Sequence, residues 1–138
     1  MSTTTTFSND VQRKFETTEV ITESKAITAA DSGKTFLISG TGYTITLPET
    51  TAGVTFKFKV VAAFSTDTVI QTVSTQRDTI SGSLIVAGAV VDADAVDRVT
   101  FEDGAERIGD FIELSSDGTV YTLFGNGAQS SSITVGEL

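Results

Sequence analysis

Carboxylates are the residues of this chain whose types and spacing come nearest to supporting chemistry. Asp92, Asp94 and Asp97 lie close together in the sequence and could offer oxygen ligands to Ca²⁺. The segment lacks the glycine that an EF-hand loop needs for its sharp turn and the glutamate that closes the coordination sphere. A solvated acidic loop is therefore the favoured interpretation, and we expect no metal site.

Other combinations of reactive residues are incomplete. Glu102, Asp103 and Glu106 could include a glycosidase-like pair, but any acidic surface loop offers such pairs. The run Ser115-Ser116-Asp117 has no histidine partner, so a turn is favoured over a nucleophile.

The absence of two residue types narrows the function further. The chain contains no histidine and no cysteine, which excludes imidazole acid–base chemistry, thiol nucleophiles and ordinary zinc sites. Gly40 and Gly42 lie between expected strands rather than before a helix, which argues against a phosphate cradle. We therefore expect a protein that is not an enzyme and that has no catalytic residues, cofactor or metal.

The charge balance argues against nucleic-acid binding. Lys and Arg number 9 against 18 Asp and Glu, and the formal net charge is −9 at pH 7. So few cations would neutralise few phosphates. The excess is concentrated in residues 92–113, where we expect a solvated acidic face. The start, MSTTTTFSND, does not have the pattern of a signal peptide, and no apolar run approaches the length of a membrane span.

The elements that must position these residues are strands. Threonine is abundant, and apolar–polar alternation recurs between turn signals. The clearest alternation covers residues 54–60, where Phe56 and Phe58 should face the core and Lys57 and Lys59 the solvent. Further strands are expected over residues 34–38, 43–47, 69–73, 79–91, 99–101 and 130–138, with 79–91 forming one strand or two hinged at Gly88, and a helical turn over 92–96.

A β-hairpin is expected within residues 109–126, GDFIELSSDGTVYTLFGN. Ile112 and Leu114 alternate with Phe111 and Glu113, and a second alternation follows Asp117-Gly118. Asp-Gly favours the positive φ angles of a two-residue hairpin turn.

The strand pattern predicts an all-β fold, a single antiparallel β-sandwich or barrel over residues 26–138. Residues 1–25 are polar with scattered apolar side chains, and they predict an extended N-terminal arm containing at most one short strand. Because a threonine-rich terminus frays unless something holds it, we expect this arm to lie on a partner subunit.

Four segments, taken in order, resemble β-rich structural proteins of tailed-phage virions. They are AADSGKTF at residues 29–36, YTITLP followed by AGVTFKF at residues 43–58, DTISG at residues 78–82, and the hairpin at residues 109–126. The resemblance covers about residues 26 to 126. The family often has a tryptophan in the final strand, where this chain has Tyr121, and residues 92–97 look like an insertion.

The resemblance implies a structural role. A short chain with an N-terminal arm is most similar to a capsid decoration (cement) protein, which would sit on the outer capsid surface of the virion as a homotrimer and bind the major capsid protein. The alternatives are a tail-fibre or receptor-binding module of the virion, or a carbohydrate-binding module.

Two groups of residues are expected to carry the contacts. The apolar anchors of the capsid-docking arm are Phe7, Val11, Phe15, Val20 and Ile21. The apolar run at residues 84–91 is the expected oligomer interface, with Leu84, Ile85, Val86, Val90 and Val91 as its contacts.

Exposed aromatic residues could instead stack on sugars. Phe7, Phe15, Phe64, Tyr43 and Tyr121 are candidates, although core or interface packing is expected for most of them. Phe64 stands out because it enters the polar loop Ser65-Thr66-Asp67.

Overall fold

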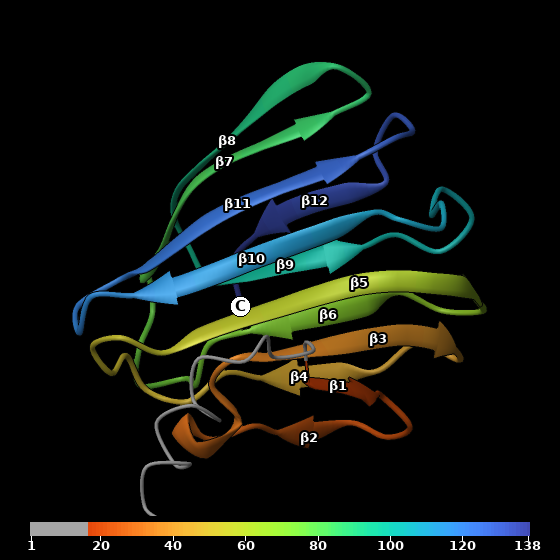
Figure 1. Ribbon diagram of the computed structural model, residues 1–138. Helices are drawn as coiled ribbons and strands as arrows, with labels where there is room; N and C mark the ends of the chain where they lie inside the picture. The colour runs from red at the N-terminus through yellow and green to blue at the C-terminus, as the bar shows by residue number, and fades with distance from the viewer. Residues whose placement is uncertain (1–16) are drawn as a thin grey trace, which may run out of the picture.

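The computed structural model describes residues 17–138, which form an all-β sandwich (Figure 1). A seven-stranded sheet has the order β1-β3-β5-β10-β11-β7-β8, and a five-stranded sheet has the order β12-β9-β6-β4-β2. The strands are β1 (Thr17–Val20), β2 (Lys25–Ala26), β3 (Lys34–Gly40), β4 (Thr44–Thr46), β5 (Thr55–Phe64), β6 (Thr68–Gln71), β7 (Ile80–Val86), β8 (Ala89–Val96), β9 (Arg98–Phe101), β10 (Phe111–Ser116), β11 (Tyr121–Gly127) and β12 (Ile133–Gly136). A 3-10 turn, η1, covers Ala29–Asp31.

Both sheets are mixed, so the prediction of a purely antiparallel sandwich is corrected. From β1 to β6 the chain crosses from one sheet to the other with every strand. When the chain returns to a sheet, the new strand therefore runs in the same direction as the previous strand of that sheet. The pairs β1–β3, β3–β5, β2–β4 and β4–β6 are accordingly parallel, and β11 also pairs in parallel with β7.

The core lies between the two sheets and confirms the predicted alternation in β5. Phe56 and Phe58 are buried there, while Lys57 and Lys59 point away from the core. Phe36 on β3 stacks on Phe58 with their ring centroids 5.2 Å apart. Because apolar and polar side chains alternate along the strands, the apolar side chains of both sheets pack between them and form one apolar interior.

The loop between β10 and β11 is longer than the predicted two-residue turn. In the hairpin of β10 and β11, Ser116 pairs with Tyr121, which leaves a four-residue loop. Asp117 explains the longer loop, because its carboxylate accepts hydrogen bonds from the amides of Thr119 and Val120 at 2.8 and 3.0 Å. The two-residue turn occurs instead at Ala87 and Gly88, with φ of 51° and 80°.

Residues 92–96 belong to strand β8, so the predicted helical turn is wrong. The strand pairs with β7, which places Asp92 and Asp94 at the exposed side while Ala93 and Val96 are buried. Residues 92–94 alternate with a period of two, and a register shift beside Ala95, whose φ is 56°, returns Val96 to the core. Pairing with the neighbouring strand thus decides the conformation of the segment. Of the two alternatives left open for residues 79–91, the structure shows two strands divided at Ala87 and Gly88.

The N-terminal part of the described chain belongs to the sandwich. β1 pairs in parallel with β3, and Glu19 forms ion pairs with Lys25 and Lys34. The expected short strand is present, but it is the edge strand of the larger sheet rather than part of a free arm. Within residues 17–138, no helix has the length and apolar character needed to cross a membrane.

Candidate functional site

The outer face of the seven-stranded sheet is the side that points away from the five-stranded sheet. Strand alternation directs every second side chain of this sheet outward. Two exposed apolar side chains of the sheet lie there, Val90 at 69% and Phe124 at 51% exposure, and Val20 at the edge is 50% exposed. The outer face is therefore the broad apolar surface of the described chain.

One row of outward residues crosses all seven strands, and we call it the cross-sheet row. Pairwise registers align its members from β1 to β8. In spatial order they are Val20, Leu37, Lys59, Phe111, Asn126, Ile85 and Val90. Five of the seven are apolar, which is unusual for the solvent side of a sheet.

A second row runs beside it and carries the charged groups. Lys57, Glu113 and Phe124 occupy neighbouring strands in this row. The Lys57 ammonium lies 4.0 Å from a Glu113 carboxylate oxygen and 5.2 Å from the centre of the Phe111 ring. Phe111 and Phe124 contact edge to face, with centroids 6.1 Å apart. Cation, carboxylate and two aromatic rings thus form one cluster at the middle of the face.

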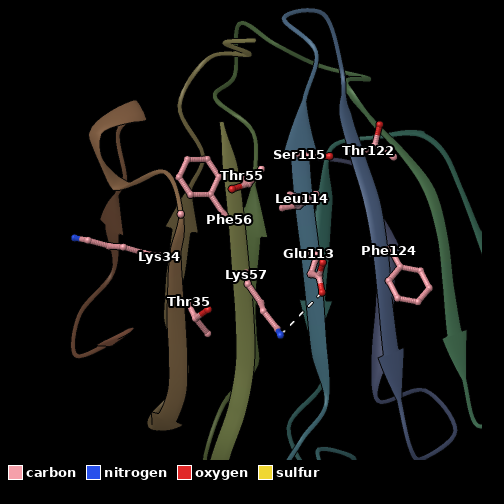
Figure 2. Close-up of a pocket in the computed structure, with 11 residues that line it drawn as sticks. Lys34, Thr35, Thr55, Phe56, Lys57, Glu113, Leu114, Ser115, Thr122 and Phe124 are labelled. Atoms are coloured by element: carbon pink, nitrogen blue, oxygen red, sulfur yellow. Dashed lines mark ion pairs between the residues drawn. The ribbon is translucent and has the colours of Figure 1, made fainter. Parts of the chain in front are cut away.

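A shallow groove of about 370 Å³ follows this second row (Figure 2). Lys57 and Glu113 point toward each other across it, and Phe124 stands on the adjoining strand. Ser115 and Thr122 extend the groove with hydroxyl groups. The groove thus offers an ion pair, an aromatic ring and two hydroxyl groups to a bound surface.

The predicted oligomer interface is divided between the two faces of the sheet. Leu84 and Val86 are buried in the core, so the prediction that they form an interface is corrected. Ile85 and Val90 lie on the outer face, and Val91 packs against the core while partly exposed. The physical reason is strand alternation, because an uninterrupted apolar run still points alternate side chains to opposite sides.

The predicted capsid-docking arm is only partly described. Phe7, Val11 and Phe15 lie outside the described residues. Val20 is half exposed at the edge of the sheet, whereas Ile21 is 2% exposed and belongs to the core. The prediction of Ile21 as an anchor is therefore corrected, because its side chain closes the sandwich beneath β1.

The three aspartates considered as Ca²⁺ ligands do not converge. Asp92 and Asp94 are exposed, while Asp97 is fully buried. Asp97 accepts hydrogen bonds from the amides of Asp78 at 2.5 Å and Leu138 at 3.0 Å, and it pairs with Arg77 at 2.9 Å. Burial raises the pKa of Asp97, but these amides and the Arg77 charge outweigh burial, and the net pKa is lowered.

Asp97 instead meets Asp78 and Glu137, with carboxylate oxygens of all three within 4.8 Å of one another. Burial and the charges of Asp97 and Asp78 raise the pKa of Glu137. Because Arg77 and two amides already satisfy Asp97, the cluster fastens the C-terminal residues to the sandwich without requiring an ion.

The other predicted carboxylates support the backbone. Glu102 accepts a hydrogen bond from the Thr134 hydroxyl at 2.6 Å, and Glu106 accepts one from the Phe64 amide at 3.1 Å. Asp103 is exposed. Asp110, which the sequence did not single out, is buried and accepts hydrogen bonds from the amides of Arg107 and Ala128. These contacts favour a structural role over a catalytic pair.

The aromatic candidates for sugar stacking are mostly internal. Tyr121 is buried and donates to the Pro48 carbonyl at 2.7 Å, and burial raises its pKa to about 12. Phe64 is 4% exposed, so its expected exposure is corrected, and Tyr43 packs against the core. On the outer face Phe124 is exposed and Phe111 is partly exposed. The alternation along the hairpin could have identified both residues. Ile112 and Tyr121 face inward, so Phe111 and Phe124, at alternate positions on the same strands, face outward.

Comparison with protein families, curated proteins and solved structures finds no match to this chain.

Proposed function

We propose that this chain is a structural protein of a tailed-phage virion, a decoration protein that binds the outer capsid surface and stabilises contacts between major capsid subunits. In this role the protein would act through binding alone. The homotrimer implied by the resemblance stays a prediction.

The observation that supports this proposal is where the four resembling segments lie in the fold. They supply β3, β5, β7, β10 and β11 of the seven-stranded sheet, which are adjacent in the order β3-β5-β10-β11-β7, and also β4 of the five-stranded sheet. Apart from β4, segments spread over about a hundred residues therefore build one continuous part of the seven-stranded sheet. Such agreement is expected when an ordered set of motifs reflects a shared architecture rather than separate coincidences.

The proposed mechanism is burial of apolar surface. A small rigid subunit that bridges neighbouring capsid subunits adds contact area on both sides. Separating the shell would then expose that area at roughly 25 cal/mol per Å² of apolar surface, less the cost of ordering the contacts. Repetition over the shell makes individually weak contacts multivalent.

The test removes residues 1–16 and measures occupancy on bare capsids by sedimentation and gel densitometry. This truncation ends before β1, so the sandwich should keep the thermal midpoint of the full chain. Occupancy should fall at least tenfold if Phe7, Val11 and Phe15 are anchors.

A matched variant, Phe7→Ser with Phe15→Ser, keeps the chain length and should reproduce the loss. Removing residues 1–20 is a poor test, because it also deletes β1 and the ion pairs of Glu19. Failure of the full-length chain to bind capsids would refute the proposed function. Full occupancy by the truncated chain would move the docking surface onto the sandwich.

A further inference from the structure

We propose that the outer face binds the outer face of a second copy of this chain. The two sheets would pack face to face about a twofold axis that runs parallel to the strands and passes over β10. This inference concerns the free protein and does not rest on the proposed virion function.

The cross-sheet row has the symmetry that such a pair requires. A twofold interface is isologous, so each residue must be compatible with the residue at the mirrored position of the row. Seven strands place β10 at the centre, and the axis brings β1 over β8, β3 over β7 and β5 over β11. The facing residues are then Val20 with Val90, Leu37 with Ile85, Lys59 with Asn126, and Phe111 with itself.

Each of these meetings is favourable or neutral. The aliphatic pairs bury apolar surface at both ends of the row, and two Phe111 rings meet at the axis. Lys59 meets an uncharged amide rather than another cation. Read from β1 or from β8, the row has two aliphatic residues, a polar residue, Phe111, a polar residue and two aliphatic residues.

The second row is compatible with the same axis. Lys57 faces Phe124 of the other copy, which extends the cation–π contact it already makes with Phe111. Glu113 faces its own copy, but a Lys57 ammonium lies 4.0 Å from each carboxylate and offsets the repulsion. Beyond it, Ser115 and Thr122 form a hydroxyl-bearing rim.

Charge also favours the outer face as the place where two copies meet. The chain carries a net charge of −9, so two copies repel each other over most of their surfaces. Lys57 and Lys59 balance Glu113 and Asp92 within the two rows. The face is thus locally neutral.

The face is also large enough for a specific contact. Seven strands spaced about 4.8 Å apart span roughly 30 Å, and three rows extend about 15–20 Å along the strands. Pairing two such faces would bury on the order of 1,000 Å² in total, which reaches the lower range of specific interfaces. We therefore expect a reversible pair rather than a permanent one.

Sedimentation equilibrium over a concentration series tests the pair. The mass should approach twice 14.5 kDa as concentration rises. Ile85→Asp and Val90→Asp should each raise the dissociation constant at least tenfold, because their carboxylates would be buried against Leu37 and Val20 of the other copy. Ile108→Asp is the matched control: Ile108 is 77% exposed and precedes β10, outside the face, so its dissociation constant should be unchanged.

Cross-linking tests the axis itself. The chain has no cysteine, so an introduced thiol is unique. Phe111→Cys should give a linked dimer with a short bis-maleimide, because the axis brings Phe111 against itself. Ile108→Cys should remain monomeric under the same conditions.

Other assemblies would overturn the proposal by distinct results. A mass of three times 14.5 kDa would support the trimer implied by the resemblance instead. A monomer whose Phe124→Asp variant loses binding to a glycan panel would identify the groove as a sugar site. Equal dissociation constants for Ile85→Asp, Val90→Asp and the control would place the contact on another surface.

Discussion

Asp97 shows how a buried charge can be held entirely by neighbouring groups of its own chain. Its two carboxylate oxygens accept from two amides that are distant in sequence, Asp78 and Leu138, and Arg77 supplies the countercharge. The carboxylate therefore connects the turn before β7 to the C-terminal residues. Hydrogen bonding to the charged form lowers its pKa despite burial, so charge and fold are linked.

Replacing Asp97 by Asn should destabilise the protein by about 3 kcal/mol at neutral pH, because an amide side chain has one acceptor oxygen for the two backbone amides of Asp78 and Leu138 and loses the charge that strengthens both bonds. The folded pKa of Asp97 lies below its unfolded value near 3.8, so its contribution is complete above that pH. It should disappear as pH falls through the folded pKa.

Urea unfolding from pH 7 downward measures this difference. The gap between the native protein and Asp97→Asn should shrink below about pH 4. Asp94→Asn, on the strand β8 that precedes Asp97, is the control, and it should change little because Asp94 is exposed. A gap that is constant with pH would show that the charge of Asp97 contributes nothing.

Metal removal should leave stability unchanged. The Asp78, Asp97 and Glu137 cluster already has Arg77 as its cation, and Asp92 and Asp94 point away from it. The thermal midpoint should be the same with EDTA and with added Ca²⁺. A midpoint that EDTA lowers and Ca²⁺ restores would contradict this, and Asp78→Asn against Asp92→Asn would then locate the site.

At the scale of the elements, β7 depends on a close approach to β11. Gly82 pairs with Leu123, and a Cβ atom at Gly82 would lie 2.1 Å from the Leu123 carbonyl oxygen. Its φ of 152° is also one that other residues rarely adopt. The strand can therefore join the sheet in parallel only because this position has no side chain.

Gly82→Ala should lower the free energy of unfolding by about 3 kcal/mol, since backbone must move to admit the methyl group. Gly53→Ala is the control: it has φ of 88° but nothing within 4 Å of the added atom, so strain alone should cost about 1 kcal/mol. Urea midpoints of the two variants give the comparison. Equal losses would mean that the contact with Leu123 relaxes without cost.

Much of the strand pattern could be predicted from the sequence, because alternation such as Phe56-Lys57-Phe58 states directly which side chains are buried. Whether neighbouring strands pair in parallel or antiparallel could not be predicted. Alternation assigns a side chain to a face, but it does not say that the chain crosses to the other sheet after β3. The turn residues were also a poor guide to turn type. Asp117 accepts a hydrogen bond within its own loop and so lengthens it, whereas the two-residue turn includes Ala87, a residue that seldom adopts a positive φ.

The candidate site was predictable in part for the same reason. Phe111 and Phe124 follow from hairpin parity, but the cross-sheet row depends on registers between strands far apart in sequence. Phe64 was misjudged because the polar residues after it suggested exposure, whereas it ends β5 facing the core.

At the scale of the whole molecule, the two proposals assign different surfaces to different partners. The outer face would bind a second copy, which leaves the N-terminal residues before β1 for the shell. A pair of chains would then carry two arms, and its capsid affinity would benefit from both binding at once. Breaking the pair should weaken shell binding without abolishing it.

A set of four proteins measures this division on bare capsids: the full chain, the chain without residues 1–16, Val90→Asp, and both changes combined. Removing the arm should lower occupancy at least tenfold whether or not the pair forms. Val90→Asp alone should reduce apparent affinity roughly 10- to 100-fold, because each arm then binds singly. If Val90→Asp alone abolished occupancy while the truncated chain bound fully, the outer face would contact the shell directly. Mass measurements on the same samples would then decide whether the free protein still pairs through that face.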